Sequence, residues 1–148
     1  MMALKIVEFH HASVRAAATQ EAVDATARFY TEVMGFKVDD SRPFVKDAPG
    51  YWLDDPSGRA QVHVIGAEGV SAFAKRPDQD ATKPHVAYGV EDIHEAMAEL
   101  DGMGVRYWVL KGLTNPDFIQ VYFDDPSGNM IEIHQVGTCM CQAVVRLG

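Results

Sequence analysis

The chain has 148 residues, of which 47% are hydrophobic and 23% charged, so it suits one soluble globular domain or two small, tightly fused halves. Its formal net charge of -8, without a basic stripe, argues against nucleic-acid binding, because neutralising phosphates requires clustered Lys and Arg. The sequence contains no apolar run long enough for a membrane helix and no pattern typical of a signal peptide. Cys139 and Cys141 form no disulfide framework and belong either to a soft-metal site or, more simply, to a tail that packs or frays. We therefore expect a cytoplasmic protein without nucleic-acid or membrane partners.

The first half of the chain has the pattern of a β-α-β-β-β unit. Alternation predicts a strand over 7–15, and apolar residues at helical spacing then predict a helix that Gly35 ends. The alternation of the strand puts four side chains on one face, namely Phe9, His11, Ser13 and Arg15. Three short strands are expected next, at 36–38, 51–53 and 61–65.

The second half repeats this order after a polar connection at 66–84. The sequence Asp-Asp-Pro-Ser-Gly occurs at 54–58 and again at 124–128, with Pro and Gly placed as a type I turn prefers. Asp92 and Glu95 begin a helix in the manner of a capping box. The strands of this half are expected at 84–90, 105–110, 118–123 and 129–134.

This repetition predicts the fold class. Neither half has enough strand to enclose a core alone, so we expect an α+β protein in which two βαβββ modules pair edge to edge into one curved mixed sheet. The concave face of such a sheet is the natural place for a ligand. Residues 1–148 would form a single domain, with modules at about 5–66 and 84–136 and a C-terminal tail at 137–148.

Potential metal ligands occupy matching points of the two halves. Strand parity puts His11 and His85 at equivalent positions on the two opening strands, and Glu132 on the last strand of the second half. Alone, each has a more ordinary interpretation as a core or surface residue. Together, two imidazoles and a carboxylate facing one cavity suit one divalent ion, such as Fe²⁺, Zn²⁺, Mn²⁺ or Ni²⁺.

His63 lies on the last strand of the first half, but out of register with Glu132. Counted from the turn glycine, Glu132 is four residues on and His63 is five. A β-bulge would restore its direction. His63 is therefore either a fourth metal ligand or a nearby acid–base group.

The other histidines carry weaker signals. His10 should point away from the face of His11, and His94 lies within the second helix, so ordinary structural or surface roles are expected for both. His134 shares the parity of Glu132 and either borders the cavity or lies beyond its rim.

Three segments resemble the vicinal oxygen chelate superfamily, which includes glyoxalase I, bleomycin and fosfomycin resistance proteins, and extradiol dioxygenases. They are FYTEVMGF at 29–36, HVAYGVED at 85–92 and DPSGNMIE at 125–132. The resemblance spans residues 5–136 and implies paired βαβββ modules and a homodimer. It also implies a metal held by His11, His85 and Glu132, with His63 in the place of the ligand from the last strand of the first module.

The departures from particular members bear on the reaction. Glyoxalase I has Glu on the last strand of both modules, whereas this chain has His63 on the first. Extradiol dioxygenases carry a His near the position of Leu113 and often another at Asp117, although Tyr122 and Glu132 fit their signature.

We therefore expect a glyoxalase-like lyase or isomerase, acting on a small substrate with vicinal oxygens through a metal-stabilised enediolate-type intermediate. Glu132 or His63 would move a proton, and Tyr122 is a candidate catalytic phenol. Arg15 either anchors an acidic substrate or is an exposed residue at a strand end. The alternatives are an Fe²⁺-dependent ring-cleaving dioxygenase and, after it, a non-catalytic binding or resistance protein.

Overall fold

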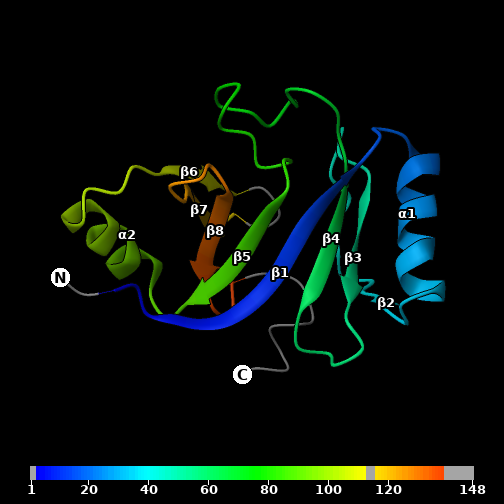
Figure 1. Cartoon of the computed structure of the whole chain (residues 1–148), viewed down its shortest axis with the longest axis horizontal. Helices are drawn as coiled ribbons and strands as arrows, with labels where there is room; N and C mark the ends of the chain where they lie inside the picture. The colour runs from blue at the N-terminus through cyan, green and yellow to red at the C-terminus, as the bar shows by residue number, and fades with distance from the viewer. Residues whose placement is uncertain (1–2, 113–115, 139–148) are drawn as a thin grey trace.

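The computed structural model describes residues 3–112 and 116–138, which form two copies of a β-α-β-β-β unit (Figure 1). The first copy consists of β1 (Ile6–Ala16), α1 (Gln20–Glu32), β2 (Lys37–Val38), β3 (Gly50–Asp54) and β4 (Gln61–Gly66). The second consists of β5 (His85–Val90), α2 (Ile93–Gly102), β6 (Trp108–Lys111), β7 (Ile119–Asp124) and β8 (Met130–Gln135). The predicted α+β class and order of elements are confirmed. Within the described ranges, no helix is long and apolar enough to cross a membrane.

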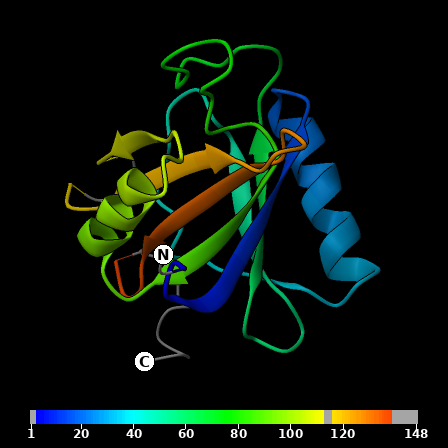
Figure 2. The same ribbon diagram turned by 60° about the vertical axis from the view of Figure 1, so that its left-hand side comes forward.

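All the strands join one mixed sheet of eight strands, in the order β2-β3-β4-β1-β5-β8-β7-β6. The opening strands of the two units, β1 and β5, pair antiparallel at its centre, and each also pairs in parallel with the last strand of its own unit. The sheet is curved and unclosed, with α1 and α2 at its opposite ends (Figures 1 and 2). The predicted edge-to-edge pairing of the two halves is therefore confirmed.

Each helix begins at a capping side chain. The hydroxyl of Thr19 accepts a hydrogen bond from the Ala22 N–H at 3.1 Å, and the Asp92 carboxylate accepts from the N–H groups of His94 and Glu95. The helices cover separate apolar cores. The core under α1 consists of Val23, Ala27, Leu53 and Val64. The core under α2 consists of Val90, Ile93, Ala96, Leu100, Val121 and Ile133. The opposite face of the sheet is thus left for polar side chains.

The repeated Asp-Pro-Ser-Gly segments form matching turns. The Gly58 N–H donates to the Asp55 carbonyl at 2.9 Å, and the Gly128 N–H donates to the Asp125 carbonyl at 3.0 Å. Both glycines have positive φ, 73° and 84°, which glycine adopts without steric cost. The turns that lead into β4 and β8 are therefore built alike.

The register of β1 against β5 shifts twice, between Ile6 and Glu8 and between Phe9 and His11, and the alternation of the sequence reveals neither shift. Phe9 pairs with Tyr88 and His11 with Ala87, so His10 is an extra residue between two ladder positions. His10 is 1% exposed and His11 is 4% exposed, whereas Phe9 is 46% exposed. The expectations that Phe9 shares the face of His11 and that His10 points away from it are wrong, because the bulge changes the phase of the strand.

Candidate metal centre

Three predicted ligands converge at the centre of the sheet, where β1, β5 and β8 lie side by side. His11, His85 and Glu132 are all buried, and one ligand atom of each lies within 4.8 Å of the other two. The Nε2 atoms of His85 and His11 lie 3.3 Å and 4.0 Å from Oε1 of Glu132. Two ligands that are each about 2.1 Å from one ion are at most about 4.2 Å apart, so this spacing fits a shared divalent ion with little movement.

The protonation of the histidines also fits this role. The Nδ1 of His85 lies 2.7 Å from the Lys83 carbonyl, which can only accept, so Nδ1 carries the proton. In the neutral ring, Nε2 is then an acceptor, to which the Ser13 hydroxyl can donate at 3.1 Å. Nε2 also faces another acceptor, Oε1 of Glu132, and a cation between these two atoms would offset their repulsion. Burial, followed by the neighbouring His63, lowers the pKa of His11 well below its usual value, so that the His11 ring is neutral near pH 7.

Donors from two strands, β7 and β8, hold the Glu132 carboxylate in place. Tyr122 Oη donates to Oε1 at 2.8 Å, Gln120 Nε2 donates to Oε1 at 3.2 Å, and His134 Nδ1 donates to Oε2 at 2.9 Å. Burial alone would raise the pKa of Glu132, but the hydrogen bond from His134 and the nearby imidazoles of His85 and His11 lower it well below its usual range. Burial and the charge of Glu132 raise the pKa of Tyr122 well above its usual value. The carboxylate is thus ionised, and the phenol is a donor to it.

The register of the sheet makes His63 equivalent to Glu132. His63 pairs with Ser13, two residues after His11, and Glu132 pairs with Ala87, two residues after His85. The extra residue of the first half lies in the turn, where the Asp55 N–H donates to the carbonyl of Ala60 rather than to that of residue 59. A bulge in β4 is therefore not needed to bring His63 into the cavity.

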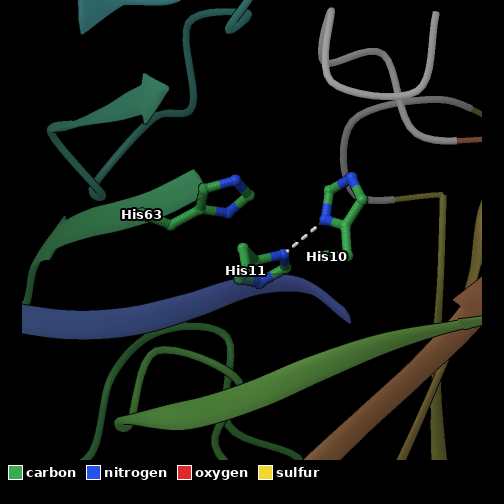
Figure 3. Close-up of side chains that lie close together, drawn as sticks. All are labelled: His10, His11 and His63. Atoms are coloured by element: carbon green, nitrogen blue, oxygen red, sulfur yellow. Dashed lines mark hydrogen bonds between the residues drawn. The ribbon is translucent and has the colours of Figure 1, made fainter. Parts of the chain in front are cut away.

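The ring of His63 nevertheless lies beside the three converging residues rather than among them. It stacks on His11 with a centroid distance of 3.7 Å, and a nitrogen of His63 lies within 4.8 Å of nitrogens of His10 and His11 (Figure 3). Its Nε2 lies 2.8 Å from Oε1 of Gln61, whose amide nitrogen donates to Asp39 and Asp54. Because that amide oxygen accepts, Nε2 carries the proton and Nδ1 has the free lone pair.

His10 and His134 belong to this cluster. The sequence predicted a position outside the site for His10, and a position at or beyond the rim of the cavity for His134. Each is 1% exposed, and their rings lie edge to face with a centroid distance of 4.5 Å. The Nδ1 atoms of His10 and His11 are 2.8 Å apart and share a hydrogen bond (Figure 3). Adjacent histidines could have signalled a bulge, but nothing in the sequence places it. His94 is exposed on α2, as expected.

The cluster forms the floor of a cavity of about 90 Å³, which is room for several water molecules or for the reacting end of a larger substrate. Its walls are largely apolar, with Val45, Ala48, Trp52, Val64, Ile65, Phe73, Ala81 and Phe118 among the lining residues. Arg42 also lines the cavity, and its guanidinium donates to the Ala48 carbonyl at 2.7 Å.

Arg15 does not line this cavity. Its guanidinium donates hydrogen bonds to Thr82 and to the Gly69 carbonyl, and these bonds hold the connection at 66–84 against β1. Leu113 lies outside the described residues, as do Cys139 and Cys141.

Replacing Tyr122 with Phe is expected to weaken divalent-ion binding by about 10- to 100-fold, the usual cost of losing a partner that orients a ligand. The substitution removes the 2.8 Å hydrogen bond to Oε1 of Glu132 but keeps the ring stacked on Trp108. Isothermal titration of the metal-free protein with Zn²⁺ would measure the change. Tyr107→Phe, which removes an exposed hydroxyl, is the matched control. Equal affinities of the two variants would contradict the positioning role of Tyr122.

Acidification below about pH 6.5 is expected to destabilise the metal-free protein. Burial, followed by neighbouring histidines, lowers the pKa of both His11 and His63 in the folded chain. Between the folded and unfolded pKa values the unfolded chain binds protons that the folded chain does not, so stability is lost as the pH falls. The free energy of unfolding should fall by up to about 1.4 kcal/mol per pH unit for each of the two rings.

Urea unfolding at a series of pH values, with a chelator present, measures this slope. His63→Gln should flatten it, whereas His94→Gln, at an exposed position, should leave it as in the parent chain. A parent stability that stays constant or rises on acidification over this range would show that the buried rings do not resist protonation.

The fold and the site together define a class: proteins built from two paired βαβββ units around a buried His/Glu group that could bind a divalent ion. The chain belongs to the Glyoxalase/Bleomycin resistance protein/Dioxygenase superfamily, whose family model matches residues 9–133. The resemblance inferred from the sequence motifs is thereby confirmed. A comparison with curated proteins gives no match.

Solved structures show the same fold at low sequence identity. Methylmalonyl-CoA epimerase from Mycobacterium tuberculosis has a TM-score of 0.68 and 20% identity, covering 91% of this chain and 92% of its own. Methylmalonyl-CoA epimerase from Streptomyces coelicolor, in complex with 2-nitronate-propionyl-CoA, has a TM-score of 0.64 and 18% identity, covering 90% and 100%. The 2,3-dioxygenase LapB from Pseudomonas sp. KL28 has a TM-score of 0.61 and 16% identity, and the match covers 93% of this chain but 43% of LapB. Proteins named as epimerases and as a dioxygenase thus share this fold.

Proposed function

We propose that this protein is a divalent-metal-dependent isomerase or lyase that moves a proton at a carbon next to a carbonyl group of a small substrate. The observation that carries the proposal is the convergence of His11, His85 and Glu132 within 4.8 Å of one another, beside a neutral imidazole at His63. An ion held by the three residues would polarise vicinal oxygens of the substrate and make the adjacent C–H bond more acidic.

His63 is better placed than Glu132 to carry the proton. Both oxygens of Glu132 already accept hydrogen bonds, from Tyr122 and His134 among others, and this carboxylate would also be a metal ligand. His63 is neutral and lines the cavity, and its Nε2–H is held by Gln61, which leaves Nδ1 as the acceptor of a substrate proton. The chain of hydrogen bonds from Asp39 and Asp54 through Gln61 would stabilise the imidazolium that forms.

The cavity favours a substrate that inserts only its reacting end. About 90 Å³ accommodates a small acyl or hydroxycarbonyl group, between apolar walls that exclude water. The guanidinium of Arg42 is the cationic group of the lining and would face a carboxylate or phosphate of the substrate. The epimerases of similar fold are named for methylmalonyl-CoA, a branched acyl thioester, which makes such thioesters one class to test.

A ring-cleaving dioxygenase is the second candidate. Two histidines and one carboxylate with open coordination positions form the ligand set of non-haem Fe²⁺ oxygenases, and LapB has a similar fold. His63 occupies the position equivalent to Glu132 and would place a third imidazole beside the ion, as an acid–base group. This feature favours proton transfer over O₂ chemistry.

The test follows proton exchange and oxygen uptake side by side. The metal-free protein is loaded separately with Zn²⁺, Mn²⁺, Ni²⁺ or Fe²⁺ and incubated in D₂O with small 2-hydroxycarbonyl compounds and branched acyl thioesters, including methylmalonyl-CoA. Proton NMR should show exchange at the carbon beside the carbonyl, and this exchange should be lost in His63→Gln and in Glu132→Gln. Oxygen uptake with catechols by the Fe²⁺ form, without proton exchange on any carbonyl substrate, would overturn the proposal in favour of a dioxygenase.

A further inference from the structure

Buried polar atoms without a hydrogen-bond partner gather at one place in the described part of the chain. There are four such side-chain atoms, and three belong to neighbouring residues: Oε1 and Oε2 of Glu8 and Nε2 of His134. A buried acceptor without a partner costs about 1–3 kcal/mol, so a cluster of three calls for an explanation. The site proposed above uses none of these atoms.

Glu8 and His134 meet His10 in a group that has the geometry of a metal site. One ligand atom from each of Glu8, His10 and His134 lies within 4.8 Å of the other two. The bulge in β1 makes this possible, because it allows Glu8 and His10 to face one site and His11 to face the other. The two histidines are 1% exposed.

The proton on His134 is fixed on the side away from Glu8. Its Nδ1 donates to Oε2 of Glu132 at 2.9 Å, and a carboxylate that is ionised can only accept. In the neutral ring, Nε2 is therefore a buried lone pair without a partner, as are both oxygens of Glu8. A cation between the two side chains would supply a partner to acceptors that no donor satisfies.

The side chain of Glu8 lies in a space that a glycine provides. A Cβ atom added at Gly89, the partner of Glu8 in the sheet, would lie 2.6 Å from Cγ and 2.7 Å from Oε1 of Glu8. A larger residue at position 89 would therefore require the Glu8 side chain to move. Burial raises the pKa of Glu8, and the neighbouring His134 opposes this shift only in part.

We propose that Glu8, His10 and His134 form a second divalent-cation site, adjacent to the first and separate from it. Two imidazoles and one carboxylate suit a borderline ion such as Zn²⁺ or Co²⁺. Glu132 links the sites, because Oε1 faces His85 in the first and Oε2 accepts from His134 in the second.

The second ion should bind more weakly than the first. The hydrogen bond between the Nδ1 atoms of His10 and His11 contains one proton. If His10 binds an ion through Nδ1, that bond is lost. If it binds through Nε2, the shared proton must stay on His10, and His11 then carries its own proton on Nε2, where the first ion would bind. Binding ions at both sites therefore requires that the hydrogen bond between His10 and His11 is broken or that its proton is released.

The test counts bound ions in variants that affect one site at a time. All proteins carry Cys139→Ser and Cys141→Ser, so that thiols do not contribute, and the metal-free forms are titrated with Co²⁺ while calorimetry and visible absorption are recorded. The parent should bind two ions with different affinities, and Glu8→Gln should bind one. His85→Ala should also bind one, with the absorption spectrum of the weaker site, which separates this inference from the proposed function.

Two further variants guard against unrelated effects of the Glu8 substitution. Gly89→Ala keeps every ligand but fills the space of the Glu8 side chain. It should lower the affinity for the second ion by at least about 10-fold. Glu68→Gln, at an exposed carboxylate, should bind two ions like the parent. A parent that saturates with one ion, or a Glu8→Gln variant that still binds two, would overturn the second site.

Discussion

Replacing Glu132 with Gln is expected to lower the affinity for the first divalent ion by more than about 100-fold and to abolish activity, since even partners of a ligand contribute 10- to 100-fold. The amide has no charge, and it keeps only one accepting oxygen, whereas Tyr122 and His134 donate to different oxygens of the carboxylate. The shape of the side chain is preserved, so the loss reports the charge and the lone pairs. Competition with a chromogenic chelator measures the affinity.

The matched control is Glu68→Gln, which removes an equal charge at an exposed position. Circular dichroism of both metal-free variants establishes that the fold is retained. An affinity for the first ion that is the same in Glu132→Gln and in Glu68→Gln would show that Glu132 is not a ligand.

Replacing Leu53 with Ala should lower the free energy of unfolding by about 2–5 kcal/mol, a large share of the 5–15 kcal/mol typical of a domain. Leu53 is 0% exposed and packs with Val23, Ala27 and Val64 beneath α1. Truncation leaves a cavity between the helix and β3 that these neighbours fill only in part. The adjacent residue Trp52 points to the other face of β3 and stacks on His63, with a distance of 5.2 Å between the ring centroids. The same strand therefore contributes to the core and to the site.

Urea unfolding of the metal-free protein measures this loss. Leu53→Met, which keeps most of the volume, is the control and should cost less than about 1.5 kcal/mol. Equal stabilities of the two variants would mean that the packing under α1 contributes little to folding.

The repeated order of strands and helices could be predicted from the sequence because each element carries a local signal. The Asp-Pro-Ser-Gly turns, the capping residue Asp92 and the helical spacing of apolar residues all depend on neighbours in the chain. The positions of His85 and Glu132 follow from strand parity, and that of His11 from its equivalence to His85 in the repeat. Once the two halves pair through β1 and β5, these residues must meet at the centre of the sheet.

What could not be predicted depends on pairing between distant strands. The bulge at His10 exists only relative to its partners on β5, and it brings His10 and Glu8 toward the site. The position of the extra residue before β4 is likewise defined only by the ladder with β1, which makes His63 equivalent to Glu132. The contacts of Arg15 with the connection at 66–84 likewise depend on tertiary structure, because Gly69 and Thr82 are distant from Arg15 in the sequence.

The most direct test of the metal centre is anomalous diffraction from crystals of the protein grown with Co²⁺ or Zn²⁺, recorded on both sides of the absorption edge of the metal. We expect an anomalous peak at about 2.0–2.2 Å from Nε2 of His11, Nε2 of His85 and Oε1 of Glu132. Crystals at saturating metal whose anomalous map shows no peak between these three side chains would contradict the account of the site and of the chemistry that depends on it.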